Sequence, residues 1–360
     1  MKPKRIGIDL FDIRNMYVGV GEFSYRLGEQ MALKAKKLRD EHGIELVFFV
    51  SPRYKGVFGH RVSYRLVGPV GRLFTRFAMR RYDLFHSVHQ YARMTPPWTT
   101  RKRLLTIHDL NFLYEKSESK KKKYYNRIRR RIAASDLVTF ISSFVERDVR
   151  KNYDIRIPGE VILNGVTNLT GIALHHEKEF NREGYLFHIS GISPKKNVHL
   201  LVEMMRFLPE EKLIIAGNTK SAYAVGLRRR VEELGLENVE FAGSVDLATK
   251  ALMYHNCKAF LFPSLCEGFG LPPVEAMCFG KPVFLSTLSS LPEVGGTAAY
   301  YWPSLEPEEM AGVVGRALTA PDEAHSPENI RKWASNFTWD KCAGRYLDLY
   351  VRMLEEVPGK

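Results

Sequence analysis

Two glutamates flank a turn rich in glycine and proline in the stretch PSLCEGFGLPPVEAMCFGKPV, residues 263–283. Glu267 precedes the turn. Glu275 follows Pro272 and Pro273, which suit the first turn of a helix. Each carboxylate can accept hydrogen bonds from vicinal hydroxyls, and the glycines let the backbone approach a ligand closely. Capping of the helix would explain one glutamate but not the other. The spacing therefore favours two carboxylates that bind the hydroxyls of one ligand from different sides.

Two more polar clusters occur in the first half of the chain. Gly19 and Gly21 in YVGVGEF follow a predicted strand and precede a helix, where backbone amides can face an anion. The pattern is incomplete as a dinucleotide fingerprint and is weak evidence for a nicotinamide cofactor. His108 and Asp109 in TIHDL end another predicted strand, where such a pair either binds sugar hydroxyls or serves as acid and base. The alternative is that Asp109 caps a loop and His108 is only packed.

Two lysines stand at a similar place in the second half. Lys195 and Lys196 in ISGISPKKNVHLL precede a helix, and two cations beside free amides suit a diphosphate; the alternative is an ordinary exposed turn. The chain has no D-x-D sequence of the kind that holds a metal against a sugar diphosphate. We expect no metal ion and no cofactor.

Short apolar runs alternate with amphipathic helical stretches along the whole chain, as in RLLTIHD and AFLFPS for strands and NVHLLVEMMRFL for a helix. Strands that are apolar on both faces are typical of parallel sheets covered by helices. Two such series predict an α/β fold with two doubly wound, Rossmann-like domains facing each other across a cleft. Ligands of such sheets bind beyond the carboxyl ends of the strands, where every cluster above falls.

The domain boundary is expected between residues 164 and 183, where polar residues and glycines interrupt the periodicity. We place the first domain at residues 1–170 and the second at residues 171–336. Residues 337–360 form a last helix that is expected to cross back to the first domain, because its apolar stripe must be buried. The stripe consists of Cys342, Tyr346, Leu349, Tyr350 and Met353.

Positive charge is concentrated in the first half of the chain. Residues 1–165 hold 34 Lys and Arg against 16 Asp and Glu, whereas the remaining residues hold 20 against 24. The stretch KSESKKKKYYNRIRRRI interleaves cations with Tyr and Ile, which suits anionic lipid headgroups or nucleic acid phosphates; the alternative is a solvated helix face. The charge asymmetry favours a membrane surface. The residues assigned to this membrane or acceptor surface are Lys120, Lys121, Lys122, Lys123, Arg129, Arg130 and Arg131.

The sequence shows neither a membrane-spanning segment nor the apolar region of a signal peptide. We therefore expect a cytoplasmic protein, bound peripherally to the inner face of the cell membrane. The cysteines show no C-x-x-C spacing and indicate reduced structural thiols rather than disulfides or zinc ligands. They are Cys257, Cys266, Cys278 and Cys342.

The motifs together resemble the retaining nucleotide-sugar glycosyltransferases of family 4, which have the GT-B fold. The resemblance rests on the E-x7-E pattern in EGFGLPPVE and on TIHDL, VILNGV, SGISPKKN, AGN, LPEVGGTAA and FTWDKCAGRYL in the expected order. It covers nearly the whole chain, is most specific in the second half and is weakest over residues 51–100. SPKKN and SLCEGFGLPPVEAM are most similar to the bacterial mannosyltransferase-like branch.

The resemblance implies a role for each cluster, with the first domain binding the acceptor and the second the nucleotide sugar. Glu267 would bind hydroxyls of the donor sugar, and Glu275 the nucleotide ribose. Lys196, with Lys195, would hold the diphosphate, and His108 would contact the sugar. The catalytic set is thus His108, Glu267 and Lys196. The other implied donor-binding positions are the amides of Phe269, Gly270 and Leu271, with Gly19 and Gly21 beside donor and acceptor.

Two positions depart from the family pattern. Many members carry an arginine shortly before the lysine, as in G-R-L-x-x-x-K, where this chain reads SGISPKKN, so Lys195 is taken as the second cation. Thr297 stands where relatives often have aspartate, and nothing in the sequence explains that change.

The implied activity is retaining transfer of a hexose from a nucleotide diphosphate sugar to a lipid-linked or glycan acceptor in cell-surface polysaccharide or glycolipid synthesis. GDP-mannose is the first donor expected, and a leaving phosphate oxygen would take the acceptor proton on the same face of the sugar. A sugar-nucleotide epimerase or hydrolase on the same scaffold is the alternative enzyme, because fold alone does not fix the reaction. A basic nucleic-acid-binding protein is the alternative from another class. No aromatic RNA-recognition motif supports it, and we expect no nucleic acid partner.

Overall fold

The computed structural model describes residues 3–15, 19–68, 70–71, 75, 81–92, 94–176 and 183–355. The chain divides into two compact units. The first unit is Met1–Gly165 together with Thr338–Lys360, and the second is Val166–Phe337. In the sequence, the second unit therefore lies between the two segments of the first unit.

A parallel sheet forms the centre of the first unit. Its described strands run in the order β3-β2-β1-β4-β5-β6-β7, and every neighbouring pair is parallel. The chain reverses its direction of travel across the sheet after β3, as in doubly wound folds. The strand bounds are β1 Lys4–Asp9, β2 Ile44–Val50, β3 Ser63–Leu66, β4 Leu84–Ser87, β5 Lys102–Ile107, β6 Leu137–Phe140 and β7 Gly159–Val161.

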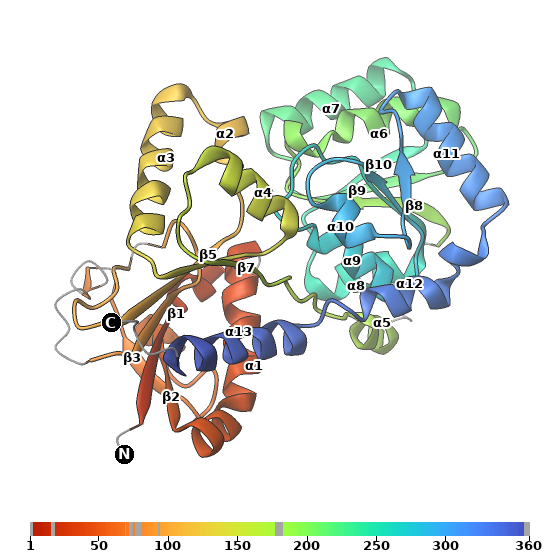
Figure 1. Cartoon of the computed structure of the whole chain (residues 1–360). Helices are drawn as coiled ribbons and strands as arrows, with labels where there is room; N and C mark the ends of the chain where they lie inside the picture. Colours follow the sequence, from red (N-terminus) through yellow and green to blue (C-terminus); the bar gives the residue numbers. More distant parts are fainter. Residues whose placement is uncertain are drawn as a thin grey trace. The chain divides into compact units, whose positions relative to one another are not determined.

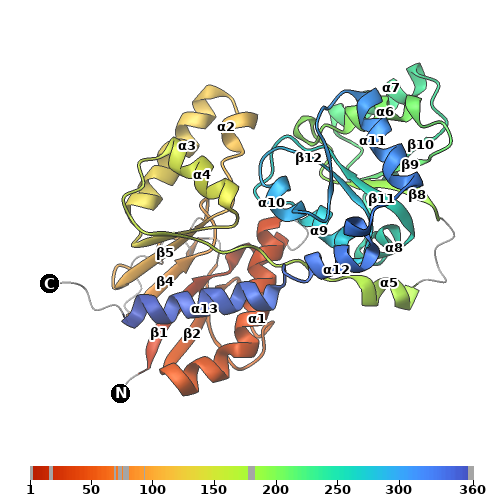
Figure 2. The same ribbon diagram turned by 45° about the vertical axis from the view of Figure 1, so that its right-hand side comes forward.

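Helices cover both faces of this sheet, since its central strands are buried on both sides. Helices α1 and α13 lie on one face, and α2, α3 and α4 lie on the other (Figure 1, Figure 2). Helix α4 begins after Ser142, whose Oγ accepts a hydrogen bond from the backbone N–H of Val145 at 3.1 Å and so caps the first turn. The helix bounds are α1 Gly19–His42, α2 Phe112–Glu115, α3 Glu118–Ala133, α4 Ser143–Asn152 and α13 Trp339–Glu355.

The second unit contains a second parallel sheet. Its described strands run in the order β10-β9-β8-β11-β12-β13. Helices α6, α7 and α11 pack on one face, where they bury a cluster of aliphatic side chains and methionines, and α8 and α9 lie on the other (Figure 1). The strand bounds are β8 Tyr185–Ile189, β9 Leu213–Ala216, β10 Val239–Gly243, β11 Cys257–Phe262, β12 Val283–Ser286 and β13 Tyr300–Trp302. The helix bounds are α5 Thr170–His176, α6 Val198–Met204, α7 Ala222–Glu233, α8 Leu247–Asn256, α9 Leu271–Cys278, α10 Leu291–Gly295, α11 Pro307–Thr319 and α12 Pro327–Ala334.

The predicted α/β fold with two parallel sheets is confirmed, and so is the return of the last helix to the first unit. The apolar stripe of α13 belongs to the same buried cluster as α1 and strands β1 and β2. Its members Cys342, Tyr346, Leu349, Tyr350 and Met353 are all buried. Within the described ranges, no helix is both long and apolar enough to cross a bilayer.

A buried polar chain fixes α13 to the sheet. His86 on β4 hydrogen bonds through Nδ1 with the hydroxyl of Tyr350 at 2.6 Å and through Nε2 with the hydroxyl of Thr106 at 2.7 Å. The Thr106 hydroxyl also lies 3.0 Å from that of Tyr346. Burial lowers the pKa of His86 to about 3, so this imidazole is neutral at pH 7. These hydrogen bonds give each buried polar group a partner and so fix the orientation of α13.

Replacing Tyr350 with Phe should test how much these hydrogen bonds contribute to stability. The variant Tyr350→Phe leaves Nδ1 of His86 buried and unpaired, and we expect it to lower the free energy of unfolding by about 1–3 kcal/mol. Chemical denaturation measures the change. Tyr54→Phe is the matched control, because its hydroxyl makes no hydrogen bond to any described residue, and it should unfold like the wild type. Equal stability of the two variants would contradict an orienting role for the His86 contact.

Candidate functional site

The stretch with the two glutamates lies where strand β11 leads into helix α9. Gly270 precedes the helix with φ +110°, a backbone region that favours glycine, and a Cβ there would lie 3.0 Å from a methyl carbon of Leu291. Pro272 and Pro273 follow in the first turn of the helix. The loop therefore passes from the carboxyl end of a central parallel strand to a helix N-terminus, the place where ligands of such sheets bind.

Glu267 is held in this loop by two donors. Its Oε1 accepts hydrogen bonds from Oγ of Ser264 at 2.6 Å and from Nζ of Lys196. The side chains of Lys196 and Glu267 are only 13% and 12% exposed, so the ion pair is mostly shielded from water. Lys196 also lies over the ring of Phe262, 5.1 Å from its centroid. The second carboxylate oxygen, Oε2, makes no hydrogen bond to the described residues.

Backbone contacts join the loop of Glu267 to the loop of the two lysines. The short 3-10 helix Pro194–Lys196 follows β8, and the carbonyl oxygen of Lys195 accepts hydrogen bonds from the backbone N–H of Leu265 at 2.8 Å and from Oγ of Ser264 at 3.2 Å. These bonds place Lys196 beside Glu267. The lysine loop and the glutamate loop therefore form one structural element at the carboxyl edge of the sheet.

Glu275 has a separate set of partners on helix α8. Its side chain is 2% exposed, and its Oε1 accepts from Nζ of Lys250 at 2.6 Å while its Oε2 accepts from the hydroxyl of Tyr254 at 2.8 Å. Lys250 and Tyr254 are four residues apart on α8 and hence share one face of that helix. Sequence reasoning identified Glu275 but missed both partners. The spacing of four residues shows that Lys250 and Tyr254 share a helix face, but it does not show that this face contacts Glu275.

His188 is a further buried polar residue that the sequence analysis did not single out. It lies in β8, where its Nδ1 is 2.8 Å from the carbonyl oxygen of Leu261 and its Nε2 is 2.8 Å from Oγ of Ser190. A carbonyl can only accept, so Nδ1 carries the proton and Nε2 accepts from Ser190. Burial lowers the pKa of His188 to about 4, and the nearby Lys196 adds to this effect. The residue is therefore neutral and positions the end of the strand.

His108 lies at the end of β5 in the first unit and is 5% exposed. Its Nε2 donates to the carbonyl oxygen of Val88 at 2.8 Å, and its backbone N–H donates to the amide oxygen of Gln90 at 3.0 Å. Burial lowers the pKa of His108 to about 4, so it is neutral at pH 7. Asp109 accepts a hydrogen bond from the backbone N–H of Asn111 at 3.0 Å, the loop-capping role set against a chemical one above.

Gly19 and Gly21 lie in the first turn of α1, and residues 16–18 fall outside the described part of the chain. A Cβ on Gly19 would meet nothing within 4 Å. Phe23 in the next turn packs edge-on against His108, with ring centroids 4.7 Å apart. The start of α1 and the end of β5 are thus neighbours within the first unit.

The residues predicted to act together fall into two sets, one in each unit. His108, Gly19 and Gly21 belong to the first unit, and the lysines and glutamates belong to the second. In the second unit, Phe269 is 3% exposed, and Leu271 begins helix α9. Among the described residues, no group of three or more His, Cys, Asp or Glu side chains is arranged to hold a metal ion.

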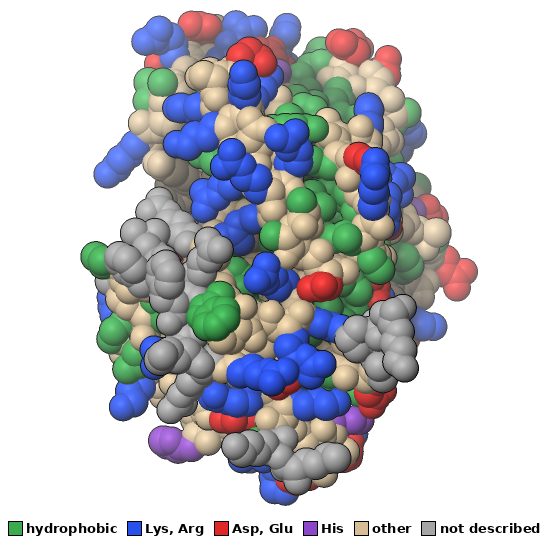
Figure 3. All heavy atoms as spheres, turned by 60° about the vertical axis from the view of Figure 1, so that its left-hand side comes forward, with side chains coloured by type: hydrophobic (Ala, Val, Ile, Leu, Met, Phe, Trp, Pro, Cys, Tyr) green, Lys and Arg blue, Asp and Glu red, His purple; other side chains and the backbone are tan. Residues whose placement is uncertain are grey.

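The basic helix α3 carries eight Lys and Arg residues and a single carboxylate, Glu118. Lys120, Lys122, Lys123, Arg129 and Arg130 are exposed, whereas Lys121 and Arg131 are half-buried. Lys121 pairs with Glu118 at 2.8 Å. Figure 3 shows Lys and Arg side chains gathered on the face that carries this helix.

The two doubly wound parallel sheets, with candidate ligand residues at the carboxyl edge of the second, define the GT-B class of glycosyltransferases. The structure is similar to sucrose-phosphate synthase from Thermosynechococcus elongatus, with a TM-score of 0.76 and 19% identity over 98% of this chain and 100% of that one. It is also similar to HepE of Anabaena in complex with UDP and glucose, with a TM-score of 0.68 and 18% identity over 97% and 100% of the two chains. WaaG, a glycosyltransferase involved in lipopolysaccharide biosynthesis, has a TM-score of 0.66 and 14% identity over 96% and 99%.

Sequence comparison gives the family. Residues 173–333 match the glycosyl transferases group 1, and residues 28–167 match Glycosyltransferase Family 4. The chain belongs to these glycosyltransferases, as the order of its motifs implies. The serotype-specific mannosyltransferase WbdA of Escherichia coli is 30% identical over 181 residues, 48% of this chain and 22% of that protein. The O-antigen chain mannosyltransferase RfbU of Salmonella typhimurium is 25% identical over 203 residues, 56% of each protein. The chain spans less than two thirds of the length of these relatives.

Replacing Lys250 should show how far Glu275 depends on its partner. Lys250→Met leaves a nearly buried carboxylate without its cation, and we expect the free energy of unfolding to fall by about 2–3 kcal/mol, because a lone buried charge is costly. Denaturant titration measures the change.

Lys258→Met is the matched control in the same unit. Lys258 pairs with Glu211 at 2.9 Å, but its side chain is 43% exposed. Water and salt screen that pair, so the control should lose only about 0–1 kcal/mol. Equal losses in the two variants would contradict a special dependence of Glu275 on Lys250.

Proposed function

We propose that the chain is a retaining hexosyltransferase that moves mannose from GDP-mannose to a lipid-linked or glycan acceptor during synthesis of a cell-surface polysaccharide or glycolipid. The second unit binds the nucleotide sugar, and the first binds the acceptor. The observation that carries the proposal is the mostly buried pair of Lys196 and Glu267 at the carboxyl edge of the second sheet.

The pair suits the sugar and the diphosphate of one donor. Ser264 and Lys196 hold Oε1 of Glu267, so Oε2 can accept a hydrogen bond from a sugar hydroxyl. An ammonium group has three N–H donors, and Lys196 gives one to Glu267, which leaves donors for phosphate oxygens. Lys195 and the amides of Phe269, Gly270 and Leu271 add positive potential where charge develops on the leaving diphosphate. The groups are oriented before the donor arrives, which is the condition for electrostatic stabilisation of the transition state.

The nucleotide ribose is assigned to Glu275. Its two oxygens are already held by Lys250 and Tyr254, so the carboxylate keeps one orientation and still has lone pairs for the vicinal hydroxyls of a ribose. Glu275 and Glu267 thus have separate partners, as expected if each glutamate binds a different part of one donor.

The histidines are assigned to hydrogen bonding rather than to proton transfer. Burial lowers the pKa of His108 and of His188 to about 4, so both are neutral at pH 7 and poorly matched to a general acid. His108 is then suited to contact a sugar hydroxyl. The proton of the acceptor would pass to a leaving phosphate oxygen on the same face of the sugar, which gives retention.

The named relatives support the sugar and the pathway. WbdA and RfbU are mannosyltransferases, and RfbU acts on the O-antigen chain. HepE has been crystallised with UDP-glucose, which supports a nucleotide sugar as the ligand of this fold. GDP-mannose is therefore the donor to test first.

Glu267→Gln should lower kcat/KM for mannose transfer by about 100-fold or more, since the amide loses the charge that grips the sugar and holds Lys196. The assay compares GDP-mannose with UDP, ADP and dTDP sugars, and we expect the highest rate with GDP-mannose. Glu237→Gln, an exposed site in the same unit, is the control and should leave the rate unchanged. Near-normal turnover by Glu267→Gln would overturn the donor-site assignment. Rapid isomerisation or hydrolysis of the donor without acceptor would overturn transfer.

We propose further that the first unit docks on the inner face of the membrane, in the cytoplasm. Its basic helix α3 presents five exposed cations, and the exposed Tyr114 of α2 precedes it in the chain. Lys and Arg near an anionic bilayer are each worth about 1 kcal/mol, and a lipid-linked acceptor would be found there.

Lys122→Gln/Lys123→Gln should weaken sedimentation with anionic vesicles by about tenfold or more, because two surface cations are lost. The wild type should not sediment with neutral vesicles, and salt should release it from anionic ones. Arg228→Gln/Arg229→Gln removes two exposed adjacent cations from α7 of the second unit and should have no effect. Indifference of the wild type to lipid charge would contradict docking.

A further inference from the structure

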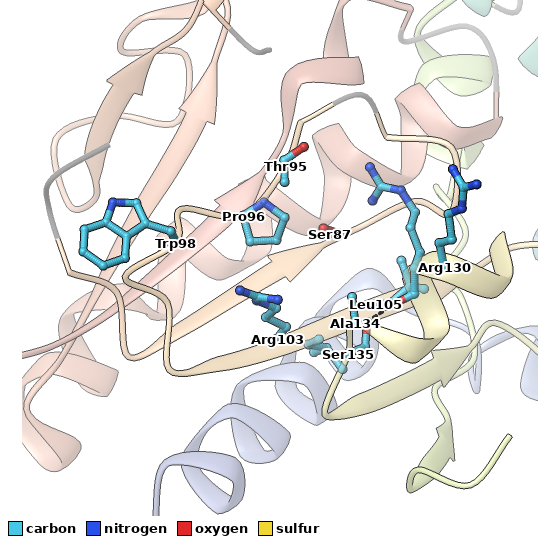
Figure 4. A pocket seen from close by; sticks show the side chains of 11 residues that line it. Ser87, Thr95, Pro96, Trp98, Arg103, Leu105, Arg130, Ala134 and Ser135 are labelled. Carbon is cyan, nitrogen blue, oxygen red and sulfur yellow. Dashed lines mark hydrogen bonds between the residues drawn. The ribbon is translucent and has the colours of Figure 1, made fainter. Parts of the chain in front are cut away.

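The first unit contains a pocket of about 350 Å³ that shares only Arg130 and Arg131 with the membrane or acceptor surface assigned above. Trp98, Pro96 and Thr95 lie on one side, and Arg103 and Arg130 lie across from them (Figure 4). The pocket is therefore formed by the segment between β4 and β5, by strand β5 and by the last turns of helix α3.

The pocket lies on the α3 face of the sheet, away from His108. Side chains alternate along β5, so Arg103 and Leu105 face the pocket while Thr106 faces α13, where it contacts Tyr346. Arg103 stands near the start of β5 and His108 directly after its end, about 16 Å away at the usual rise per residue. Arg103 therefore lies away from His108, whereas Ser87, the last residue of β4, also lines the pocket.

The lining is cationic without a compensating carboxylate. Three of the eleven lining residues are arginines, Arg103, Arg130 and Arg131, and none is Asp or Glu. Within the described chain, the guanidinium groups of Arg103 and Arg130 make no ion pair. Asp136, whose carboxylate accepts a hydrogen bond from the backbone N–H of Arg103 at 2.7 Å, does not line the pocket. Unpaired guanidinium groups favour a phosphate, whose oxygens match their fork of donors.

Arg131 serves the rim rather than the ligand. Its guanidinium donates to the backbone carbonyl oxygens of Ala92 and of Met94, the latter at 3.1 Å, and Arg127 one turn earlier donates to that of Tyr91 at 2.8 Å. Burial lowers the pKa of Arg131 to about 10, which leaves it charged at pH 7. The segment before Trp98 is thus tied to α3, so the pocket is preformed.

Trp98 distinguishes the source of the phosphate. Its side chain is 65% exposed, although an indole gains from burial, and it follows Pro96 and Pro97, which restrict the segment. An exposed tryptophan beside cations is typical of a membrane interface, where the ring sits at headgroup level. A soluble phosphate would gain nothing from such a rim.

We propose that this pocket binds the phosphate group of a membrane lipid headgroup while Trp98 enters the bilayer interface beside it. The inference rests on the proposed docking of the first unit on a membrane and adds a specific contact to the diffuse attraction of α3. The exposed lysines of α3 respond to surface charge of any kind, whereas the pocket responds to phosphate.

The experiment uses the full chain and vesicles of a neutral, phosphate-free galactolipid that carry either phosphatidic acid or oleate at matched surface potential. We expect the wild type to bind the phosphatidic acid vesicles about tenfold more tightly, since the pocket's unpaired guanidinium groups attract the phosphate. Arg103→Gln/Arg130→Gln should bind both vesicles equally. Lys122→Gln/Lys123→Gln should bind both more weakly and keep the preference.

Two further readouts complete the test. The indole emission should shift to shorter wavelength on phosphatidic acid vesicles, and Trp98→Phe should lose that shift. Circular dichroism and the thermal midpoint must show that each variant is folded.

Three outcomes would overturn different parts of the proposal. Equal binding of wild type to both vesicles, still dependent on Lys122 and Lys123, would overturn the pocket and leave membrane docking in place. Absence of binding to either vesicle would overturn docking and the lipid source together. Release of the arginine-dependent preference by millimolar inorganic phosphate, with no change in Trp98 emission on vesicles, would make this a soluble phosphate site and overturn the proposal. Transfer to a soluble acceptor would be unaffected in all three cases.

Discussion

The ion pair between Lys196 and Glu267 is the interaction on which the second unit's site depends. It joins two loops that are 71 residues apart in sequence, and its side chains are largely withdrawn from water. Such a pair is stable only if each charge has further partners, and here Ser264 donates to the carboxylate while the ring of Phe262 faces the ammonium. Serine hydroxyls extend the support, since Ser289 accepts from the backbone N–H of Glu267 and Ser290 donates to its carbonyl oxygen. These contacts hold the loop in one arrangement without a ligand.

Sequence reasoning recovered the parts of this site that depend on local rules. The alternation of apolar runs and helices predicted the parallel sheets. The glycines of the loop were expected to let the backbone approach a ligand, and the structure adds that Gly270 has a positive φ, which favours glycine. The partners of Glu267 and Glu275 were not predicted, because Ser264, Ser289 and Lys250 become neighbours only when the sheet is assembled. The same limit applies to Arg131, which was assigned to a membrane or acceptor surface with the other cations of α3. The structure turns its guanidinium inward to backbone carbonyl oxygens, and a run of like charges carries no sign of which member will do so.

The two units carry very different net charges. The excess of cations lies in the segment that forms most of the first unit, and the second unit is close to neutral. A neutral unit can hold an anionic nucleotide through a few oriented groups, without attracting other polyanions by long-range potential. A basic unit is attracted to anionic surfaces. Because each unit has its own hydrophobic core, the surface charge of one unit can change without altering the packing of the other.

Helix α13 gives the fold an unusual order of completion. Its residues are the last of the described chain, yet they fill the core of the unit that begins at the N-terminus. During synthesis the second unit is continuous and complete while the first still exposes the apolar face that α13 will cover. The usual order, in which N-terminal domains fold first, is therefore reversed for the final packing step. A chain lacking α13 would expose the apolar face of the first unit that this helix covers.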